Sequence, residues 1–200
     1  MKSFVLAVMS LLALTAGSPE TTGYQVGDEV ADFELKHIDG SMVSLSKYGD
    51  KGAIVIFDCN TCPYSKAYRE RIKALDAMFA DKGYPVIAVN SNNETKSPGD
   101  SYDMMKSYAA EHNFKHAYVY DEDQSVAKAF GATNTPHVYV VQKDGEEMVV
   151  KYIGAIDNNT KDAAAADKKY VEEAVNALLN GKNPEITKTK ALGCTIKWAS

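Results

Sequence analysis

The segment Cys59-Asn60-Thr61-Cys62, followed at once by Pro63, constrains the fold of this chain more than any other feature. An apolar run, Ala53 to Phe57, comes directly before it, and a helical pattern comes directly after it. Two cysteines separated by two residues at a strand-to-helix junction are typical of a redox motif. The motif therefore predicts a buried strand that leads into a helix, with two thiols where these elements meet.

The N-terminal end of the predicted helix suggests the chemistry of the two cysteines. A thiolate in the first turn of a helix lies beside unpaired backbone N–H groups and the positive end of the helix dipole. Such surroundings lower a thiol pKa from about 8.5 toward roughly 3.5–7.5. We therefore expect an exposed, acidified Cys59 as the nucleophile and Cys62 as the cysteine that resolves the mixed disulfide. Pro63 suits the helix start because its missing N–H would have no partner there.

Two other roles for the pair stay open at this point. A structural zinc site needs four Cys or His ligands, usually as two pairs. The chain has three cysteines and four histidines; Cys194 lies far from the pair, and the histidines show no paired spacing with it. An inert structural disulfide is the other alternative. The sequence predicts no metal site and favours a redox role.

Composition bounds the rest of the interpretation. A chain of 200 residues with 45% hydrophobic content buries one ordinary core, which favours a single α/β domain. The formal net charge of −5 gives no basis for nucleic-acid binding, which needs a basic patch. Acidic and basic residues are mixed along the chain, so their simplest interpretation is a solvated surface.

The first residues have the pattern of a secretory signal peptide. Lys2 supplies a positive charge, residues 4–14 are almost entirely apolar, and residues 15–18 are small enough for cleavage within 16–18. A membrane span would need about 20 apolar residues. We therefore expect residues 1–17 to direct export, and the mature protein to be periplasmic or secreted. In an oxidising compartment a disulfide persists, and an odd number of cysteines suggests an exchanging thiol.

The remaining pattern alternates strands with helices. Residues 18–181 are expected to form the domain, and residues 182–200 to form a C-terminal tail. Alternating elements favour a layered α/β domain with a mixed sheet and helices on both faces. The expected strands are 33–35 and 42–45 (a hairpin around Asp39-Gly40), 53–57, 86–89, 117–120, 138–141 and 148–153; the expected helices are 63–80, 101–112, 124–130 and 168–180.

This order, with Thr135-Pro136 before the last hairpin, resembles the thioredoxin fold. The segments Phe57–Tyr64 and Gly193–Trp198 more narrowly resemble an exported, peroxiredoxin-like redoxin family of the AhpC/TSA type with a Cys-x-x-Cys motif. The resemblance covers roughly residues 24–200. It implies a thioredoxin-like fold with an N-terminal β-hairpin and an inserted, helix-bearing segment at about 91–116.

The resemblance also assigns expected roles around the dithiol. Thr135-Pro136 matches the loop that faces the dithiol with a cis peptide bond, which would leave the Thr135 backbone free to pair with an extended substrate. Tyr64, one turn from the dithiol, is a candidate substrate-side residue. Thioredoxin's buried acid is replaced here by Ala53. Asp58 is an auxiliary candidate for proton relay, although an acid at a strand end is more often exposed.

Cys194 keeps two interpretations. It is either a partly buried free thiol, or an auxiliary cysteine that exchanges with the dithiol after the tail folds back. Trp198 would anchor that tail by burying its large ring.

The resemblance implies a thiol–disulfide oxidoreductase. Its substrates would be exported proteins or small thiols, with a separate thiol–disulfide electron partner and no cofactor, because the cysteines carry the two electrons. A thiol peroxidase is an alternative, although the Thr and Pro that peroxiredoxins place before their reactive cysteine correspond, counted from Cys62, to Cys59 and Val55. A copper(I) chaperone that uses both thiolates and His137 is another alternative.

Overall fold

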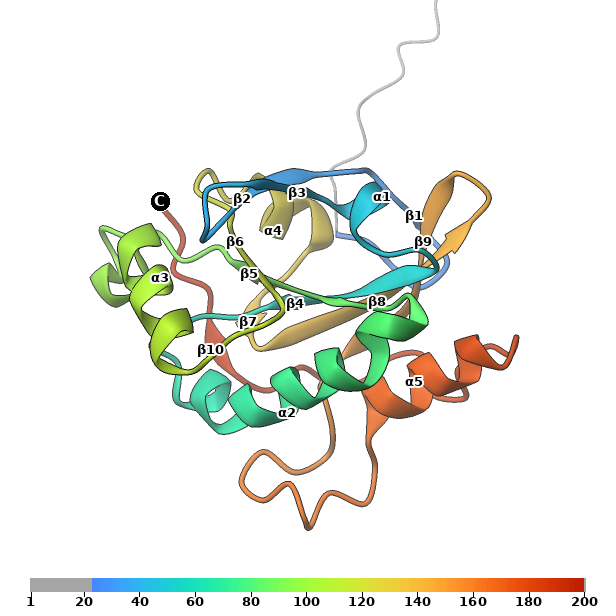
Figure 1. Cartoon of the computed structure of the whole chain (residues 1–200). Helices are drawn as coiled ribbons and strands as arrows, with labels where there is room; N and C mark the ends of the chain where they lie inside the picture. Colours follow the sequence, from blue (N-terminus) through green and yellow to red (C-terminus); the bar gives the residue numbers. More distant parts are fainter. Residues whose placement is uncertain (1–22, 200) are drawn as a thin grey trace, which may run out of the picture.

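The computed structural model describes residues 23–199 of the chain. The expected signal peptide, residues 1–17, lies outside the described residues. The C-terminal helix of the domain and the tail that follows it lie at the red end of the colour scale in Figure 1.

Within residues 23–199, eight strands form one mixed sheet in the order β1-β9-β8-β4-β5-β6-β2-β3 (Figure 1). The two remaining described strands, β7 and β10, form a small antiparallel pair. The strands are β1 (Glu29–Val30), β2 (Glu34–His37), β3 (Met42–Ser44), β4 (Gly52–Phe57), β5 (Val86–Asn90), β6 (Ala117–Tyr120), β7 (Asn134–Thr135), β8 (His137–Asp144), β9 (Glu147–Gly154) and β10 (Cys194–Thr195). The helices are α1 (Leu45–Tyr48), α2 (Pro63–Phe79), α3 (Tyr102–Glu111), α4 (Ser125–Phe130) and α5 (Tyr170–Leu179).

The strand directions confirm the mixed sheet expected of a thioredoxin-like fold. Strands β4, β5 and β6 run parallel, whereas β8 pairs antiparallel with both β4 and β9. The predicted hairpin is also confirmed, because β2 and β3 pair antiparallel. Strand β2 also pairs antiparallel with β6, which attaches the hairpin to the rest of the sheet. The inserted segment carries α3, which packs against β6.

Strand β4 divides the core into two layers because successive side chains point to opposite faces of a sheet. Ala53, Val55 and Phe57 face the layer that contains α4. Ile54 and Ile56 face the layer that contains α2 and α5. The continuous apolar run of β4 therefore has the pattern of a strand buried on both faces, as the sequence predicts.

The tail is packed against the domain along much of its length. The Thr189 amide donates to the Ile153 carbonyl oxygen at 2.9 Å, and β10 pairs antiparallel with β7. Ile196 is buried in the core, whereas Trp198 is 37% exposed. The expectation that Trp198 anchors the tail is therefore wrong, because the buried apolar side chain of this segment is Ile196.

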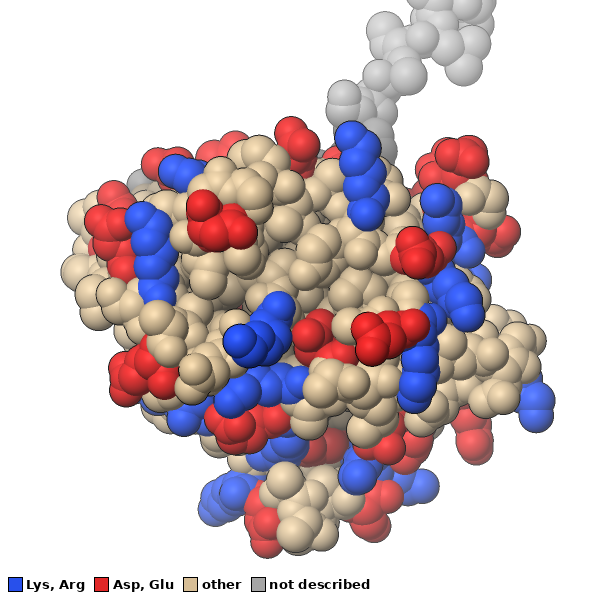
Figure 2. All heavy atoms as spheres, in the orientation of Figure 1, with Lys and Arg blue, Asp and Glu red and all other residues tan. Residues whose placement is uncertain are grey.

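The surface agrees with the mixed charge of the sequence. Figure 2 shows Lys and Arg interspersed with Asp and Glu on the face that it presents. Within residues 23–199, none of the helices combines the length and the apolar character that crossing a membrane requires.

The core of this fold makes a direct prediction about stability. Ile56 is fully buried between the sheet and α2, so Ile56→Ala leaves a cavity. We expect the free energy of unfolding of the reduced protein to fall by about 2–5 kcal/mol. Met104 is 47% exposed on α3. Met104→Ala should therefore change the free energy by no more than about 0.5 kcal/mol. Urea unfolding measures both changes, and an equal effect of the two substitutions would contradict this description of the core.

Candidate active site

The cysteine pair lies in the turn between β4 and α2. Helix α2 has Pro63 as its first residue, which makes Cys62 the N-cap residue and leaves Cys59 three residues farther from the helix. Because the unpaired N–H groups and the dipole act within the first turn, Cys62 receives their effect most directly. The prediction assigned this effect to Cys59.

Thr135 holds the two sulfur atoms from the opposite side. Its hydroxyl oxygen lies 3.3 Å from Cys59 Sγ, and its carbonyl oxygen accepts a hydrogen bond from Cys62 Sγ at 3.1 Å. The Thr135–Pro136 peptide bond is cis, as expected. One residue thus contacts both thiols, and they lie next to one another rather than in separate pockets.

The expectation of an exposed, acidified Cys59 is wrong in both respects. Cys59 is 2% exposed and Cys62 is 3% exposed. Interaction with Cys62, followed by burial, raises the pKa of the Cys59 thiol. The pKa of Cys62 is lowered, first by the Cys59 thiol and also by the Cys194 thiol and the backbone N–H groups of Ser65 and Cys194, which together outweigh its burial. The sulfur at position 62 is therefore the one that ionises more easily, and the hydrogen bond that its thiol donates to the Thr135 carbonyl oxygen is lost when it does so.

Cys194 joins this pair from the far end of the chain. Strand β10 lies beside β7 (Figure 1), and in this pair Cys194 is directly opposite Thr135. Burial, and then the contact with Cys62, raises the pKa of Cys194, and the Tyr64 amide opposes this rise. The alternative in which the tail folds back therefore has the matching geometry. The same pairing means that the Thr135 backbone is not free, contrary to expectation, because the chain's own tail occupies it.

Asp58 is buried rather than exposed, which also differs from expectation. Its side chain is at the end of β4 and the residue is 5% exposed. Burial raises its pKa from 3.8 to about 7, although the Ser65 hydroxyl and the Cys59 amide oppose the rise. Among the described residues, its Oδ1 atom has no hydrogen-bond partner. A carboxyl group that titrates near neutral pH beside Cys59 is suited to accept or donate a proton.

Asp100 is a structural residue of the site that the sequence interpretation missed. It is fully buried, and its carboxylate accepts the backbone N–H groups of Asn60 and Thr61 at 2.8 and 3.0 Å. The same carboxylate accepts three side-chain hydrogen bonds, from Thr61, Asn92 and Ser97, at 2.6–2.8 Å. The inserted segment thereby fixes the turn between the two cysteines. Composition marks residues 91–100 only as a loop, and nothing local in the sequence shows that it reaches this turn.

The remaining candidate residues, Tyr64 and His137, differ in their exposure to solvent. Tyr64, in the first turn of α2, is 42% exposed, so its ring is available to a substrate. His137 is buried, which lowers its pKa to about 4, and its Nδ1 atom accepts the Thr133 amide. Within residues 23–199, no group of three or more His, Cys, Asp or Glu side chains is arranged to hold a metal ion. The geometry gives the copper hypothesis no support.

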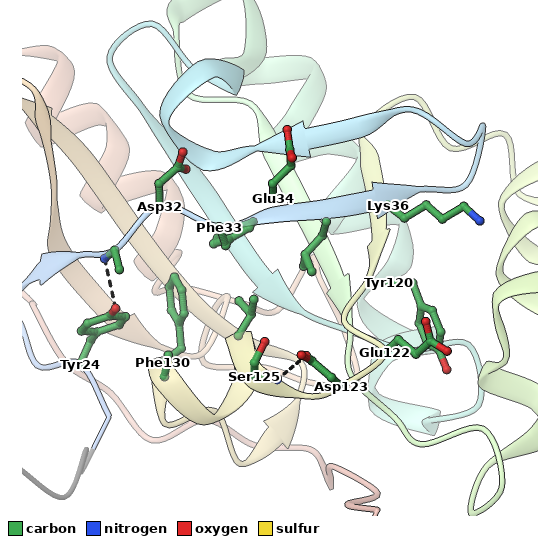
Figure 3. A pocket seen from close by; sticks show the side chains of 14 residues that line it. Tyr24, Asp32, Phe33, Glu34, Lys36, Tyr120, Glu122, Asp123, Ser125 and Phe130 are labelled. Atoms are coloured by element: carbon green, nitrogen blue, oxygen red, sulfur yellow. Dashed lines mark hydrogen bonds between the residues drawn. The ribbon is translucent and has the colours of Figure 1, made fainter. Parts of the chain in front are cut away.

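An open cavity of about 600 Å³ lies away from the cysteines, between β2 and α4. Figure 3 shows Asp32, Glu34, Glu122 and Asp123 around it, with Lys36 at its side. The Ser125 amide donates to Asp123 at 2.9 Å, and the Tyr24 hydroxyl accepts the Ala31 amide at 3.1 Å. None of the residues that line this cavity is a cysteine, so it is separate from the dithiol.

The chain belongs to the AhpC/TSA family, whose profile matches residues 26–152, more than half of its length. It is similar to the thiol-disulfide oxidoreductase ResA of Oceanobacillus iheyensis, with 26% identity over 127 residues. That match spans 62% of this chain and 62% of the length of the relative. The family supports the redoxin resemblance that the cysteine motif suggests.

Two solved structures resemble most of the chain. A hypothetical protein from Sinorhizobium meliloti 1021 is 28% identical, with a TM-score of 0.81 over 89% of this chain and 97% of the other. An uncharacterized conserved protein from Geobacillus kaustophilus is 30% identical, with a TM-score of 0.81 over 91% of this chain and 97% of the other. The thioredoxin-like fold also matches a Chlorobium tepidum structure described as a thiol:disulfide interchange protein, at 21% identity and a TM-score of 0.59.

The five hydrogen bonds of Asp100 generate a prediction about the turn. Asp100→Asn leaves buried donors without an acceptor, so the free energy of unfolding should fall by about 3 kcal/mol. The looser turn should also speed alkylation of Cys59. The control is Asp103→Asn, because the Asp103 side chain is 90% exposed. Urea unfolding measures the change in free energy, and timed alkylation measures the change in the reactivity of Cys59. An equal response of the two variants would rule out the role of Asp100 in holding the turn.

The raised pKa of Asp58 generates a prediction about pH. Because the pKa is about 7 in the folded protein and the ordinary value is 3.8, the folded state binds this proton more tightly than the unfolded state. The stabilising contribution is therefore complete below the ordinary value and is lost as the pH rises through 7.

Asp58→Asn should remove this dependence. Between about pH 5 and pH 8, the wild-type protein should lose about 2.5 kcal/mol of unfolding free energy relative to the variant. Urea unfolding of both reduced proteins at the two pH values measures the difference, in which other titrating groups largely cancel. A difference that does not change with pH would show that Asp58 is ionised throughout this range.

Proposed function

We propose that this chain is a thiol–disulfide oxidoreductase that exchanges disulfides with exported protein or small-thiol substrates through Cys59 and Cys62. The supporting observation is the convergence of these thiols at the start of α2, with the pKa of Cys62 lowered. A thiolate is the species that attacks a disulfide, so the favoured thiolate is the nucleophile. This reverses the roles that the sequence suggested for the two cysteines.

The first step is attack by the Cys62 thiolate on one sulfur of a substrate disulfide. A bond forms between Cys62 Sγ and that sulfur, while the disulfide bond of the substrate breaks. The other half of the substrate leaves as a thiolate and takes a proton from solvent. The product is a mixed disulfide at Cys62.

The second step releases the remaining half of the substrate. Cys59 lies against Thr135 beside Cys62, and its thiol must lose a proton before it attacks Cys62 Sγ. We assign this proton to the Asp58 carboxylate, which titrates near neutral pH. Attack forms the Cys59–Cys62 disulfide and expels the second thiolate. The protein loses two electrons, and the substrate gains them. The proton of Cys59 passes through Asp58 to the second thiolate, whereas the first thiolate has taken its proton from solvent.

Three further residues have proposed substrate-side roles. Thr135 orients both sulfur atoms, and the cis peptide bond to Pro136 directs this backbone toward them. Tyr64 presents an exposed ring beside the same helix end. A protein substrate that pairs with Thr135 must displace β10, whereas a small thiol or disulfide need not.

The ResA relatives support this reaction class, and a thiol–disulfide partner would regenerate the enzyme. We place the protein in the periplasm or outside the cell, because residues 1–17 have the pattern of an export signal. No cofactor is required, because the sulfur atoms carry the electrons.

Peroxide reduction at Cys62 is a second candidate function. It is favoured by the family and by the position of Cys62 at the N-cap, where its pKa is lowered. Cys62 would attack a peroxide oxygen, form a sulfenic acid and release an alcohol or water. A thiol would then convert the sulfenic acid to a disulfide with loss of water.

A single-turnover assay tests the main proposal. Reduced protein is mixed with an aromatic disulfide whose cleavage releases a coloured thiolate, and mass spectrometry locates the product. The wild-type protein should release both halves of the disulfide. The Cys59→Ser/Cys194→Ser variant should release one half and retain the other on Cys62. Cys62→Ser should react at least about tenfold more slowly.

Retention of the aromatic group on Cys59 in a Cys62→Ser protein, at the parental rate, would overturn this assignment of the nucleophile. Replacing the aromatic disulfide with hydrogen peroxide separates the two candidate functions. Faster oxidation by peroxide than by the disulfide would favour the peroxidase.

A further inference from the structure

The C-terminal tail closes over the dithiol and is fixed there by backbone contacts. The Ile196 amide donates to the Thr133 carbonyl oxygen at 3.0 Å, next to the pairing of β10 with β7. Farther along, the Lys197 amide donates to the Asn92 side chain at 2.8 Å. Figure 1 shows this red segment beside β7 and near the start of α2. The tail is therefore part of the wall of the site.

Gly193 allows the tail to approach this closely. A Cβ atom on Gly193 would lie 2.1 Å from the Thr135 carbonyl oxygen, which is far inside van der Waals contact. The Gly193 carbonyl oxygen in turn accepts a hydrogen bond from the Asn134 side chain at 3.0 Å. The chain thus brings its next residue, Cys194, to the same carbonyl that binds the Cys62 thiol.

The three cysteines differ in their exposure to solvent. Cys59 and Cys62 are almost completely buried, whereas Cys194 is partly exposed. A thiol from outside must reach a disulfide sulfur along the S–S axis, so a disulfide confined to Cys59 and Cys62 is poorly placed for reduction. A disulfide that includes Cys194 would offer an accessible sulfur.

Resting on the proposed function, we propose that Cys194 is a third redox cysteine through which an external thiol reduces the buried disulfide. Cys194 lies opposite Thr135, whose carbonyl oxygen accepts the hydrogen bond of the Cys62 thiol, so the two cysteines meet at the same residue. Each of the two thiols also shifts the pKa of the other. In the oxidised protein Cys62 bears no negative charge, so the contact that helps raise the pKa of Cys194 is absent. Cys194 then ionises more easily than in the reduced protein.

The first relay step moves the disulfide without changing the oxidation state of the protein. The Cys194 thiolate attacks Cys62 Sγ, a Cys62–Cys194 bond forms, and the Cys59–Cys62 bond breaks. Cys59 leaves as a thiolate and takes up the proton that Cys194 has lost, with Asp58 beside it as a carrier. The disulfide then has one partly exposed sulfur.

The next two steps consume two molecules of external thiol. The first, as a thiolate, attacks Cys194 Sγ, forms a mixed disulfide there and expels Cys62. Cys62 is the most favourable leaving group of the three because a thiol of lower pKa leaves faster. The second thiol attacks the mixed disulfide, releases Cys194 and produces the external disulfide. The protein gains two electrons, and the external thiols lose them. One of the two protons that the external thiols give up restores the Cys194 thiol, and the other goes to solvent because Cys62 stays a thiolate.

The test is the rate at which reduced glutathione reduces the oxidised protein. Samples are quenched with acid, alkylated and analysed by mass spectrometry for each cysteine. We expect Cys194→Ser to slow reduction of the Cys59–Cys62 disulfide by about tenfold or more. Thr195→Ala is the matched control, because Thr195 is the exposed neighbour of Cys194 on the same strand, and it should reduce at the parental rate. Reduction of Cys194→Ser at the parental rate or faster would overturn the proposal.

A second measurement does not depend on the behaviour of the Cys194 variant. Cys59→Ser, oxidised with a stoichiometric disulfide, should form an intramolecular Cys62–Cys194 disulfide that is found in a non-reduced digest. The relay would be overturned if Cys62 and Cys194 remained open to alkylation after oxidation, or if they formed disulfides only between molecules.

The failure of the relay is distinguishable from the failure of the proposed function. If wild-type protein and Thr195→Ala both reduce the aromatic disulfide, and Cys194→Ser is reduced by glutathione as fast as they are, only the relay is wrong. If the reduced wild-type protein does not react with the disulfide, the proposed function itself is wrong.

Discussion

The position of Cys62 at the N-cap of α2 is the constraint on which the chemistry of this site depends. Pro63 starts the helix, so the residue before it lies where backbone N–H groups lack helical partners. The side chains of Cys59 and Cys194 each lower the pKa of Cys62 and so favour its thiolate form. The charge therefore belongs to the second cysteine of the motif, while the first is kept protonated by the same interaction that ionises its neighbour.

Four distant parts of the chain hold this arrangement in place. The β4–α2 turn carries the pair, the inserted segment binds the turn through Asp100, the cis-proline loop contacts both sulfur atoms, and the tail closes the site. The sheet gives these segments a common frame, since β4 and β8 pair with Phe57 opposite His137. Removal of one segment would therefore disturb both the stability of the turn and the ionisation of the thiols.

Much of the fold is predictable from local pattern. The apolar run of β4, the helical spacing after Pro63 and the hairpin around Asp39-Gly40 depend on near neighbours in the sequence, and the structure confirms all three. The cis Thr135–Pro136 bond was also expected, from the resemblance to thioredoxin-like proteins. These features follow from periodicity, from turn residues or from a motif with few alternatives.

The details of the site depend on contacts between distant segments, which local pattern does not encode. Asp58 looks like an exposed strand-end acid until the surrounding elements bury it, and Asp100 looks like a loop residue. Trp198 is a stronger apolar candidate than Ile196, yet the structure buries Ile196 in the core and leaves Trp198 partly exposed. The N-cap position of Cys62 could have been predicted, because a proline at the first helical position indicates which cysteine precedes the helix, but the prediction assigned the effect of the helix start to Cys59.

Direct titration of the two thiols tests the assignment of charge. The thiolate ultraviolet absorbance is followed against pH in Cys59→Ser/Cys194→Ser, which keeps Cys62, and in Cys62→Ser/Cys194→Ser, which keeps Cys59. Serine preserves a hydroxyl donor toward the remaining sulfur. We expect the pKa of Cys62 to lie below that of Cys59, because burial still raises the pKa of Cys59 after Cys62 is replaced, and the backbone N–H group of Ser65 still lowers the pKa of Cys62. The opposite order would show that Cys59 is the nucleophile and that the start of α2 does not determine which sulfur is charged.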